Sequence, residues 1–221
     1  MKTKILILGM LSAVALPSIS EASFIKNAYV GLSVGYARHN ISPHLSNGTK
    51  LPVLHKARRF GGVPAGLHFG GELFRNNDIF TALELGADFM GSSKRTATSD
   101  RGTDHRYKVE SGFSSELAFK VGFTSWGFTP YAQIGLIGTH WTQRYSITSP
   151  TPNLNVSAKK RMFKLGWAPG GGVIFKINKK WSSGFEYKYA MYKRHQLRFK
   201  DEHIRIKPRS HDVRLRLSYS L

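Results

Sequence analysis

The sequence predicts an all-β protein, an eight-stranded antiparallel up-and-down transmembrane β-barrel. Three observations predict it. Apolar and polar side chains alternate with a period of two along most of the chain, long polar connections alternate with short turns, and the N-terminus has the pattern of an export signal. An even number of sequential antiparallel strands with this rhythm of connections is typical of barrels that close on themselves.

The first residues have the features of a signal peptide. Lys2 and Lys4 precede an apolar run over 5–16, Pro17 ends that run, and Ser20-Glu21-Ala22 has the small-x-small form of a cleavage site. The run is well short of the ~20 residues that a membrane-spanning helix needs. We therefore expect a signal peptide at 1–22, cleavage after Ala22, and an exported barrel domain at 23–221.

Eight segments of the exported chain alternate as half-buried strands do. We expect them near 28–38, 60–74, 79–90, 107–123, 129–141, 162–177, 181–192 and 211–221. In the first four, one face carries Val30, Leu32 and Val34, then Leu67 and Phe69, then Leu83 and Leu85, then Leu117 and Phe119. In the last four it carries Ile134 and Leu136, then Leu165 and Trp167, then Phe185 and Tyr187, then Leu215 and Leu217. Pro169 interrupts the sixth segment and predicts a bulge or kink there.

The connections divide into two kinds. Long polar segments over about 39–59, 91–106, 142–161 and 193–210 follow the odd-numbered strands, and short turns at 75–78, 124–128 and 178–180 follow the even-numbered ones. This arrangement predicts four long loops on one rim and three tight turns on the other. A strand of ~10 residues tilted by ~45° spans roughly 25 Å, the height of an outer-membrane apolar band.

Alternation alone leaves open which face points inward. A soluble, lipocalin-like barrel would enclose the apolar face, whereas a membrane barrel would expose it to lipid. The other face carries charges of both signs mixed with small residues: Glu84, Glu116, Lys120, Glu186, Lys188, Arg214 and Arg216. Paired charges and small side chains suit the narrow interior of eight strands, which favours the membrane barrel. We expect Trp126, Trp141 and Trp181, near strand ends, to lie in interfacial aromatic girdles.

Several strands resemble the superfamily of small eight-stranded outer-membrane β-barrels, which includes the outer-membrane-protein-A transmembrane domain and the opacity-type surface proteins. The resemblance lies in AYVGLSVGYA (28–37), FTALELGADF (80–89), FTPYAQIGLIG (128–138), GWAPGGGVIFKI (166–177), SSGFEYKYA (182–190) and DVRLRLSYSL (212–221). It implies a Gram-negative outer-membrane location, a monomer with periplasmic termini, and recognition of the last strand by the barrel-assembly machinery. The family usually ends in Phe, whereas this chain ends in Leu221.

An enzyme is one alternative, because some barrels of this size modify lipid A with a Ser, His and acid constellation. The candidates are His140 with Thr142, and Ser210-His211-Asp212. The first has Thr where the deacylase pattern has Ser. In the second, consecutive residues of a strand point to alternate faces, so they do not form a relay. We expect no enzyme, no cofactor and no metal site, and we read His39, His44, His55, His105, His195 and His203 as solvated loop residues.

The interior charges allow two hypotheses. Glu84, Glu116 and Glu186 could exchange cationic partners in a small gated pore, or they could form a static polar plug with Lys120, Lys188 and Arg214. Eight strands leave little room for water, which favours the plug.

The chain has 33 Lys and Arg against 13 Asp and Glu, a formal charge of +20. Export makes nucleic acid an improbable partner, and the absence of cysteine excludes disulfides and thiol chemistry. Most excess cations fall in the four long segments, which predicts basic external loops that attract polyanions. Lipopolysaccharide phosphates would meet Arg58, Arg59, Lys159, Lys160 and Arg161. A host glycosaminoglycan would meet Lys193, Arg194, Arg198 and Lys200 farther out. The basic loops could also reflect only a basic proteome.

Overall fold

A computed structural model describes residues 26–45, 59–76, 78–100, 103–148, 156–193, 195–199 and 202–221. The predicted signal peptide at 1–22 and its cleavage site lie outside the described residues. Among the described residues, no helix is long and apolar enough to cross a membrane.

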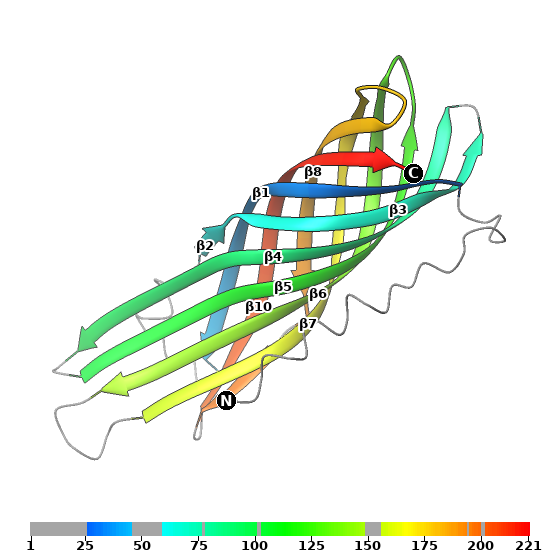
Figure 1. Ribbon diagram of the computed structural model, residues 1–221. Coiled ribbons are helices and arrows are strands. Elements are labelled where there is room, and N and C mark those ends of the chain that lie inside the picture. Colours follow the sequence, from blue (N-terminus) through cyan, green and yellow to red (C-terminus); the bar gives the residue numbers. More distant parts are fainter. Residues whose placement is uncertain are drawn as a thin grey trace, which may run out of the picture.

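The described chain forms one antiparallel sheet that closes into a barrel (Figure 1). Its strands are β1 (Lys26–Leu45), β2 (Arg59–Gly62), β3 (Pro64–Asn76), β4 (Ile79–Asp100), β5 (Thr103–Phe123), β6 (Phe128–Thr148), β7 (Val156–Lys176), β8 (Trp181–Tyr192), β9 (His195–Phe199) and β10 (Glu202–Ser220). The order is β2-β1-β3-β4-β5-β6-β7-β8-β10-β9, and pairing of β1 with β10 completes the ring. Because β2 and β3 share β1 as a partner, and β8 and β9 share β10, the wall has eight positions. The predicted eight-stranded barrel is confirmed.

Three short turns lie at one rim, which we call the turn rim. In the turn between β5 and β6, Trp126 and Gly127 adopt positive φ angles of 49° and 87°. In the turn between β7 and β8, Asn178 Oδ1 accepts hydrogen bonds from the backbone N–H groups of Lys180 and Trp181 at 2.9 and 2.8 Å. The start of β1 and the end of β10 meet at the same rim, where the Leu221 N–H donates to the Ala28 carbonyl at 2.9 Å.

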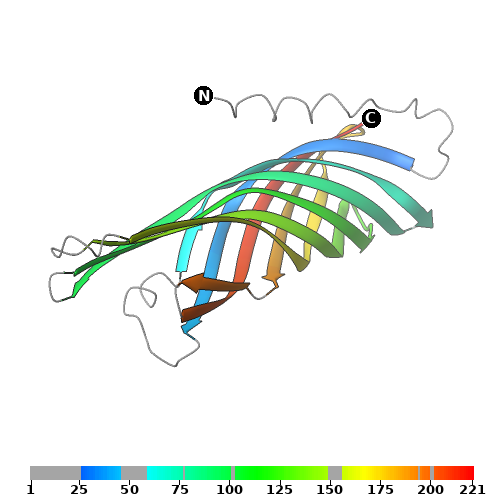
Figure 2. The same cartoon turned by 90° about the horizontal axis from the view of Figure 1, so that it is seen from below.

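The strands run much farther toward the opposite rim, the extended rim, than the sequence predicts (Figure 2). The segment 91–106, predicted as a loop, consists of the arms of β4 and β5 apart from residues 101–102. Strands likewise enter the other three predicted loops, at 39–45, 142–148, 156–161 and 202–210. The prediction was wrong here because most residues of these extensions are polar, so the apolar period ends although the backbone ladder continues.

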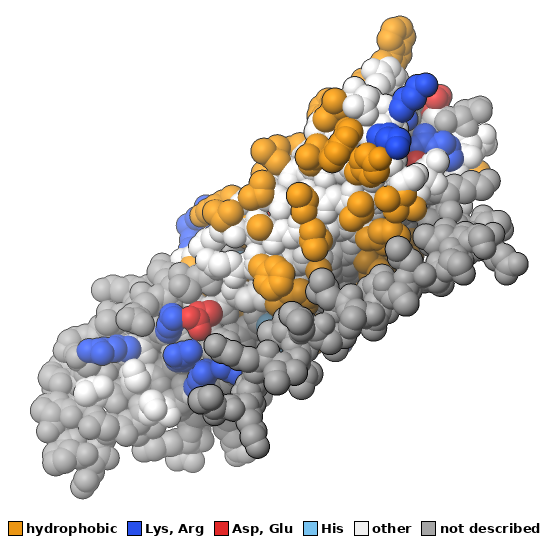
Figure 3. Space-filling view, viewed as in Figure 1, with side chains coloured by type: hydrophobic (Ala, Val, Ile, Leu, Met, Phe, Trp, Pro, Cys, Tyr) orange, Lys and Arg blue, Asp and Glu red, His pale blue; other side chains and the backbone are white. Residues whose placement is uncertain are grey.

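The apolar face of the wall points outward and the polar face points into the lumen. Leu32, Leu85 and Leu215 are 58, 57 and 62% exposed, whereas Lys120 and Arg214 are 2 and 3% exposed. On the face that Figure 3 shows, apolar side chains cover much of the middle of the barrel, and basic side chains lie toward both ends. This orientation, which the membrane-barrel hypothesis predicts, leaves the charged side chains as the interior packing.

Pro169 lies inside β7 and causes a gap in the ladder, not a bulge. Trp167 and Gly170 each have a partner on β8, whereas the two residues between them have none, and the register is the same on both sides of this gap. Because proline has no N–H to donate, loss of one ladder contact is the expected local effect.

Candidate functional site

A cluster of paired charges lies inside the lumen, on the side nearer the turn rim. Lys120 Nζ donates to Glu84 Oε2 at 2.8 Å and lies 3.2 Å from Glu186 Oε2. Arg216 bridges the same two carboxylates. Two phenols complete the cluster, because Tyr29 donates to Glu84 at 2.8 Å and Tyr131 donates to Glu186 at 2.7 Å. Each carboxylate therefore has a lysine, an arginine and a hydroxyl as partners.

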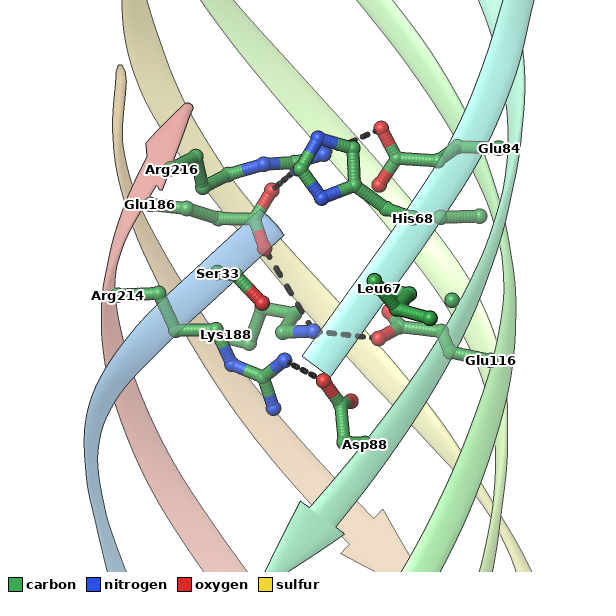
Figure 4. Close-up of a pocket in the computed structure, with 12 residues that line it drawn as sticks. Ser33, Leu67, His68, Glu84, Asp88, Glu116, Glu186, Lys188, Arg214 and Arg216 are labelled. Carbon is green, nitrogen blue, oxygen red and sulfur yellow. Dashed lines mark hydrogen bonds and ion pairs between the residues drawn. The ribbon is translucent and has the colours of Figure 1, made fainter. Parts of the chain in front are cut away.

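A second set of ion pairs lies next to this cluster, toward the extended rim (Figure 4). Lys188 Nζ lies 2.5 Å from Glu116 Oε2 and 3.5 Å from Glu186 Oε1. Arg214 pairs with Asp88 and also with Asp212, whose Oδ2 lies 2.5 Å from Nη2. The structure thus brings together the seven charged residues that the sequence assigned to the polar face, Arg216 among them, and it adds two: Asp88 and Asp212. Asp88 and Asp212 share the inward period of their strands, which is the signal that could have found them.

Ion pairing explains how so many charged side chains can be buried inside the barrel. The buried side chains of the described lumen include four cations, from Lys120, Lys188, Arg214 and Arg216, and five carboxylates, from Glu84, Asp88, Glu116, Glu186 and Asp212. Removing an ion from water costs several kcal/mol, and close partners with additional hydrogen bonds offset most of that cost. The members come from four different strands, β4, β5, β8 and β10, so the pairs cross-link the wall.

The network leaves little free space inside the barrel. The cavity between Ser33, His68, Glu116 and Arg214 measures about 10 Å³, room for about one water molecule. On the turn-rim side a vestibule of about 740 Å³ extends inward between residues such as Tyr29, Phe80 and Ile174, and Glu84, Lys120 and Arg216 are among the residues that line it.

An aromatic layer fills the lumen on the side of the extended rim. The His39 ring lies 4.9 Å from Phe60 and 5.2 Å from Trp141, and the Trp141 ring lies 5.7 Å from Tyr192. Tyr192 also forms a 3.0 Å hydrogen bond with Thr139. Two predictions were wrong here: Trp141 is 2% exposed and is not interfacial, and His39 is 0% exposed and is not a loop residue. Both lie at positions that alternation assigns to the lumen.

The candidate catalytic residues Ser210, His211 and Asp212 do not share a face of β10. Ser210 and Asp212 are buried on the lumen side of β10, whereas the intervening His211 points outward, where its Nδ1 is 2.8 Å from the Tyr187 hydroxyl. His140 lies on the outer wall, with its ring 4.9 Å from that of Phe163. In the part of the chain that the structure describes, no three His, Asp or Glu side chains are grouped as a metal site requires.

The basic residues nominated for anion binding lie on strands or at their ends instead of in long loops. Arg59 begins β2, Lys159, Lys160 and Arg161 lie within β7, and Lys193 directly follows β8. Arg198 belongs to β9, with only its backbone described. Arg58, Arg194 and Lys200 lie outside the described residues. The location in loops was wrong because β7 begins at Val156, well before its apolar alternation starts.

The described basic residues form a ladder on the outer face of β5, β6 and β7. Lys108 is the register partner of Arg144, and Arg144 is the partner of Lys159, so the three side chains leave the same face. In the next row, Thr142 is the register partner of Glu110 on one side and of Arg161 on the other. Register partners share a face of a sheet, and the partner of Lys160 is the lumen-facing Gln143. Lys160 therefore lies on the opposite face from its neighbours on β7.

Among the side chains that the structure describes, Glu110 is the one acidic residue beside this ladder. Glu110 forms a salt bridge with Lys108 and lies 3.9 Å from Arg144. The hydrogen bond from Lys108 lowers the pKa of the Glu110 carboxyl. The positive charges of Arg161 and Arg144 lower the pKa of the Lys159 ammonium. Glu110 therefore relieves only part of the repulsion among these cations.

Sequence comparison decides the family of this chain. Residues 6–220 match the outer membrane protein β-barrel domain. The chain belongs to that family. The predicted location in the bacterial outer membrane is confirmed by this membership. Because short turns face the periplasm in such barrels, the turn rim is the periplasmic rim and the extended rim is the external rim.

Solved structures show the same fold at low sequence identity. The outer membrane protein OprG from Pseudomonas aeruginosa is 11% identical with a TM-score of 0.51, over 89% of this chain and 97% of that one. The outer membrane protease OmpT from Escherichia coli is 7% identical with a TM-score of 0.51, over 88 and 97%. Neisserial surface protein A is 13% identical with a TM-score of 0.45, over 88 and 97%. No curated protein sequence matches the chain.

Proposed function

We propose that this outer-membrane barrel is a surface-interaction protein whose external rim binds polyanions and whose lumen is plugged. The observation that carries the proposal is the charge of the external rim. Among the described side chains there, one acid, Glu110, accompanies eleven solvent-accessible basic residues: Arg38, Arg59, Arg106, Lys108, Arg144, Lys159, Lys160, Arg161, Lys193, Lys207 and Arg209.

Such a rim attracts anionic polymers by its summed field, and its arginines suit phosphate or sulfate groups because guanidinium can donate two parallel hydrogen bonds. The basic residues lie on two parts of the rim. Arg38 and Arg209 belong to β1 and β10, while Arg144 and Lys159 belong to β6 and β7. A flexible polyanion can therefore contact several positions at once, which raises its apparent affinity.

The lumen supports binding at the surface over the alternative of a small pore. The interior cavity of about 10 Å³ and the layer around Trp141 leave no described space for a hydrated ion between the vestibule and the external rim. The placement of His211 on the face opposite to Ser210 and Asp212 likewise favours a binding role over the alternative of a lipid-A-modifying hydrolase.

Retention of the purified, folded barrel on immobilised heparin at graded salt tests the proposal. Retention is expected at low ionic strength and is expected to weaken as salt screens the rim. Arg144→Gln on the external rim should elute at lower salt than the matched variant Lys179→Gln, which removes a charge from the periplasmic rim. Absence of retention even at low salt, or equal effects of the two variants, would contradict the proposal.

A further inference from the structure

A row of aromatic rings marks the external edge of the lipid-facing wall over β4 to β7. The Phe113 ring lies 5.5 Å from that of Phe89 and 6.3 Å from that of His140, which in turn lies 4.9 Å from that of Phe163. Phe89, Phe113 and Phe163 are 66, 38 and 48% exposed on the outer face. Leu165 and Trp167 continue this apolar surface toward the periplasm, so the row is the last apolar layer before the polar extension.

The cationic ladder begins directly beyond this row on the same face. Arg161 is two residues and Lys159 four residues from Phe163 along β7, about 7 and 13 Å at the usual strand rise. With a tilt of about 40°, they lie roughly 5 and 10 Å above the aromatic row along the membrane normal. The headgroup layer on each side of a bilayer is roughly 5–8 Å thick, so the backbone of Arg161 lies within this layer and that of Lys159 lies just beyond its outer edge.

The ladder has more positive charge than its own acid can neutralise. Glu110 pairs with Lys108 and approaches Arg144 at 3.9 Å, while Arg161 and Lys159 extend the positive surface along β7. The lowered pKa of Lys159 has the charges of Arg161 and Arg144 as its main causes. An anion placed among these three side chains would remove that repulsion.

We propose that Arg144, Lys159 and Arg161 bind a phosphate of a lipopolysaccharide molecule in the outer leaflet, whose acyl chains lie against the row formed by Phe113, His140 and Phe163. The inference rests on the proposed function and assigns one ligand to one part of the rim. A lipid is favoured over a soluble polyanion because the cations continue the lipid-facing surface, whereas a polymer from solution needs no adjoining apolar wall. Lys160 faces away from this surface and does not take part.

Binding of lipid A to the full barrel in nanodiscs tests the assignment. Diphosphorylated lipid A is the probe, and dephosphorylated lipid A, inorganic phosphate and heparin are the comparison ligands. Lys159→Gln and Arg161→Gln should each weaken binding of diphosphorylated lipid A by roughly three- to tenfold, the range of a partly exposed charge-assisted contact. Lys160→Gln removes the same charge from the same strand on the other face, so its affinity should stay within about twofold.

Each outcome bears on the inference. Equal effects of Lys159→Gln and Lys160→Gln, or equal binding of dephosphorylated lipid A, would overturn it. Inorganic phosphate that binds as tightly as lipid A would contradict the role of the aromatic row. If heparin is retained but lipid A binding does not depend on Lys159 or Arg161, the inference fails and the proposed function survives. If neither ligand binds, both fail. A heat-dependent shift on unboiled denaturing gels confirms that each variant is folded.

Discussion

The ammonium of Lys188 on β8 lies 2.5 Å from the carboxylate of Glu116 on β5. These strands are not neighbours in the sheet, because β6 and β7 separate them. The pair therefore crosses the lumen and holds two parts of the wall at a fixed separation. It is one of several such links, and it shows that the interior is a packed polar core.

Glu116→Ala is expected to destabilise the barrel by about 3–5 kcal/mol, since it leaves the buried Lys188 with Glu186 as its remaining close carboxylate. Urea unfolding of the barrel in lipid vesicles measures the loss. The double variant Glu116→Leu with Lys188→Met removes both charges and should recover most of it. An unchanged unfolding midpoint for Glu116→Ala would show that the pair contributes nothing.

The wild-type barrel is expected to give no well-resolved conductance in planar bilayers. The charged network and the aromatic layer occupy successive levels of the lumen, and the space within the network is about 10 Å³. A known porin inserted under the same conditions serves as the positive control. Reproducible current steps would favour the gated pore, in which the glutamates exchange partners.

Trp141→Ala is expected to cost about 3–5 kcal/mol, because the side chain is 2% exposed and packs against His39, Phe60 and Tyr192. Trp126→Ala, at a side chain 98% exposed in a periplasmic turn, should change the free energy of unfolding by less than about 1 kcal/mol. Unfolding midpoints of the two variants provide the comparison. Similar losses would contradict the lumenal position of Trp141.

Binding of a sulfated polymer is expected to strengthen as pH falls below 4.5. The pKa of Glu110 is lowered from its usual value of 4.5 by the hydrogen bond from Lys108, so the carboxylate stays charged at neutral pH and takes a proton only below that value. Protonation frees Lys108 and Arg144 for the ligand, whose sulfates remain ionised. Dextran sulfate affinity should rise roughly two- to fivefold through this window.

Glu110→Gln is the matched control for this pH dependence. The variant should bind dextran sulfate more tightly than the wild type at pH 7, and its affinity should not rise through the window below pH 4.5. A rise of the same size in the variant would assign the effect to another group.

The sequence predicted which side chains face lipid and which face the lumen better than it predicted how the lumen side chains pair with one another. Alternation placed Glu84 and Lys120 on one face and Leu83 and Phe119 on the other, because lipid and lumen differ sharply in polarity. It could not predict that Lys120 meets Glu84 and Glu186, because partners across a lumen depend on the stagger between strands. The period did assign Trp141 to the interior, but the frequency of interfacial tryptophans in such barrels led to the opposite prediction.

The external extensions illustrate a different limit. Arg144 and Lys159 lie on paired strands, yet most of their neighbours along each strand are polar, so no alternation of hydropathy marks the ladder. Their register was therefore absent from the sequence pattern, although it determines which cations share a surface. The separation of Lys159 from Lys160 follows only once β7 is known to be extended there.

The pairing of β1 with β10 has a consequence for the order of assembly. Arg214 and Arg216, the two buried arginines among the described residues, both lie on β10, the last of the described strands. Until that strand docks, Glu84, Glu186 and Asp88 lack their guanidinium partners, and β1 and β8 present unpaired edges. Closure of the ring and neutralisation of the interior are therefore one event, so an intermediate without its final strand would be both open at its edges and unbalanced in charge.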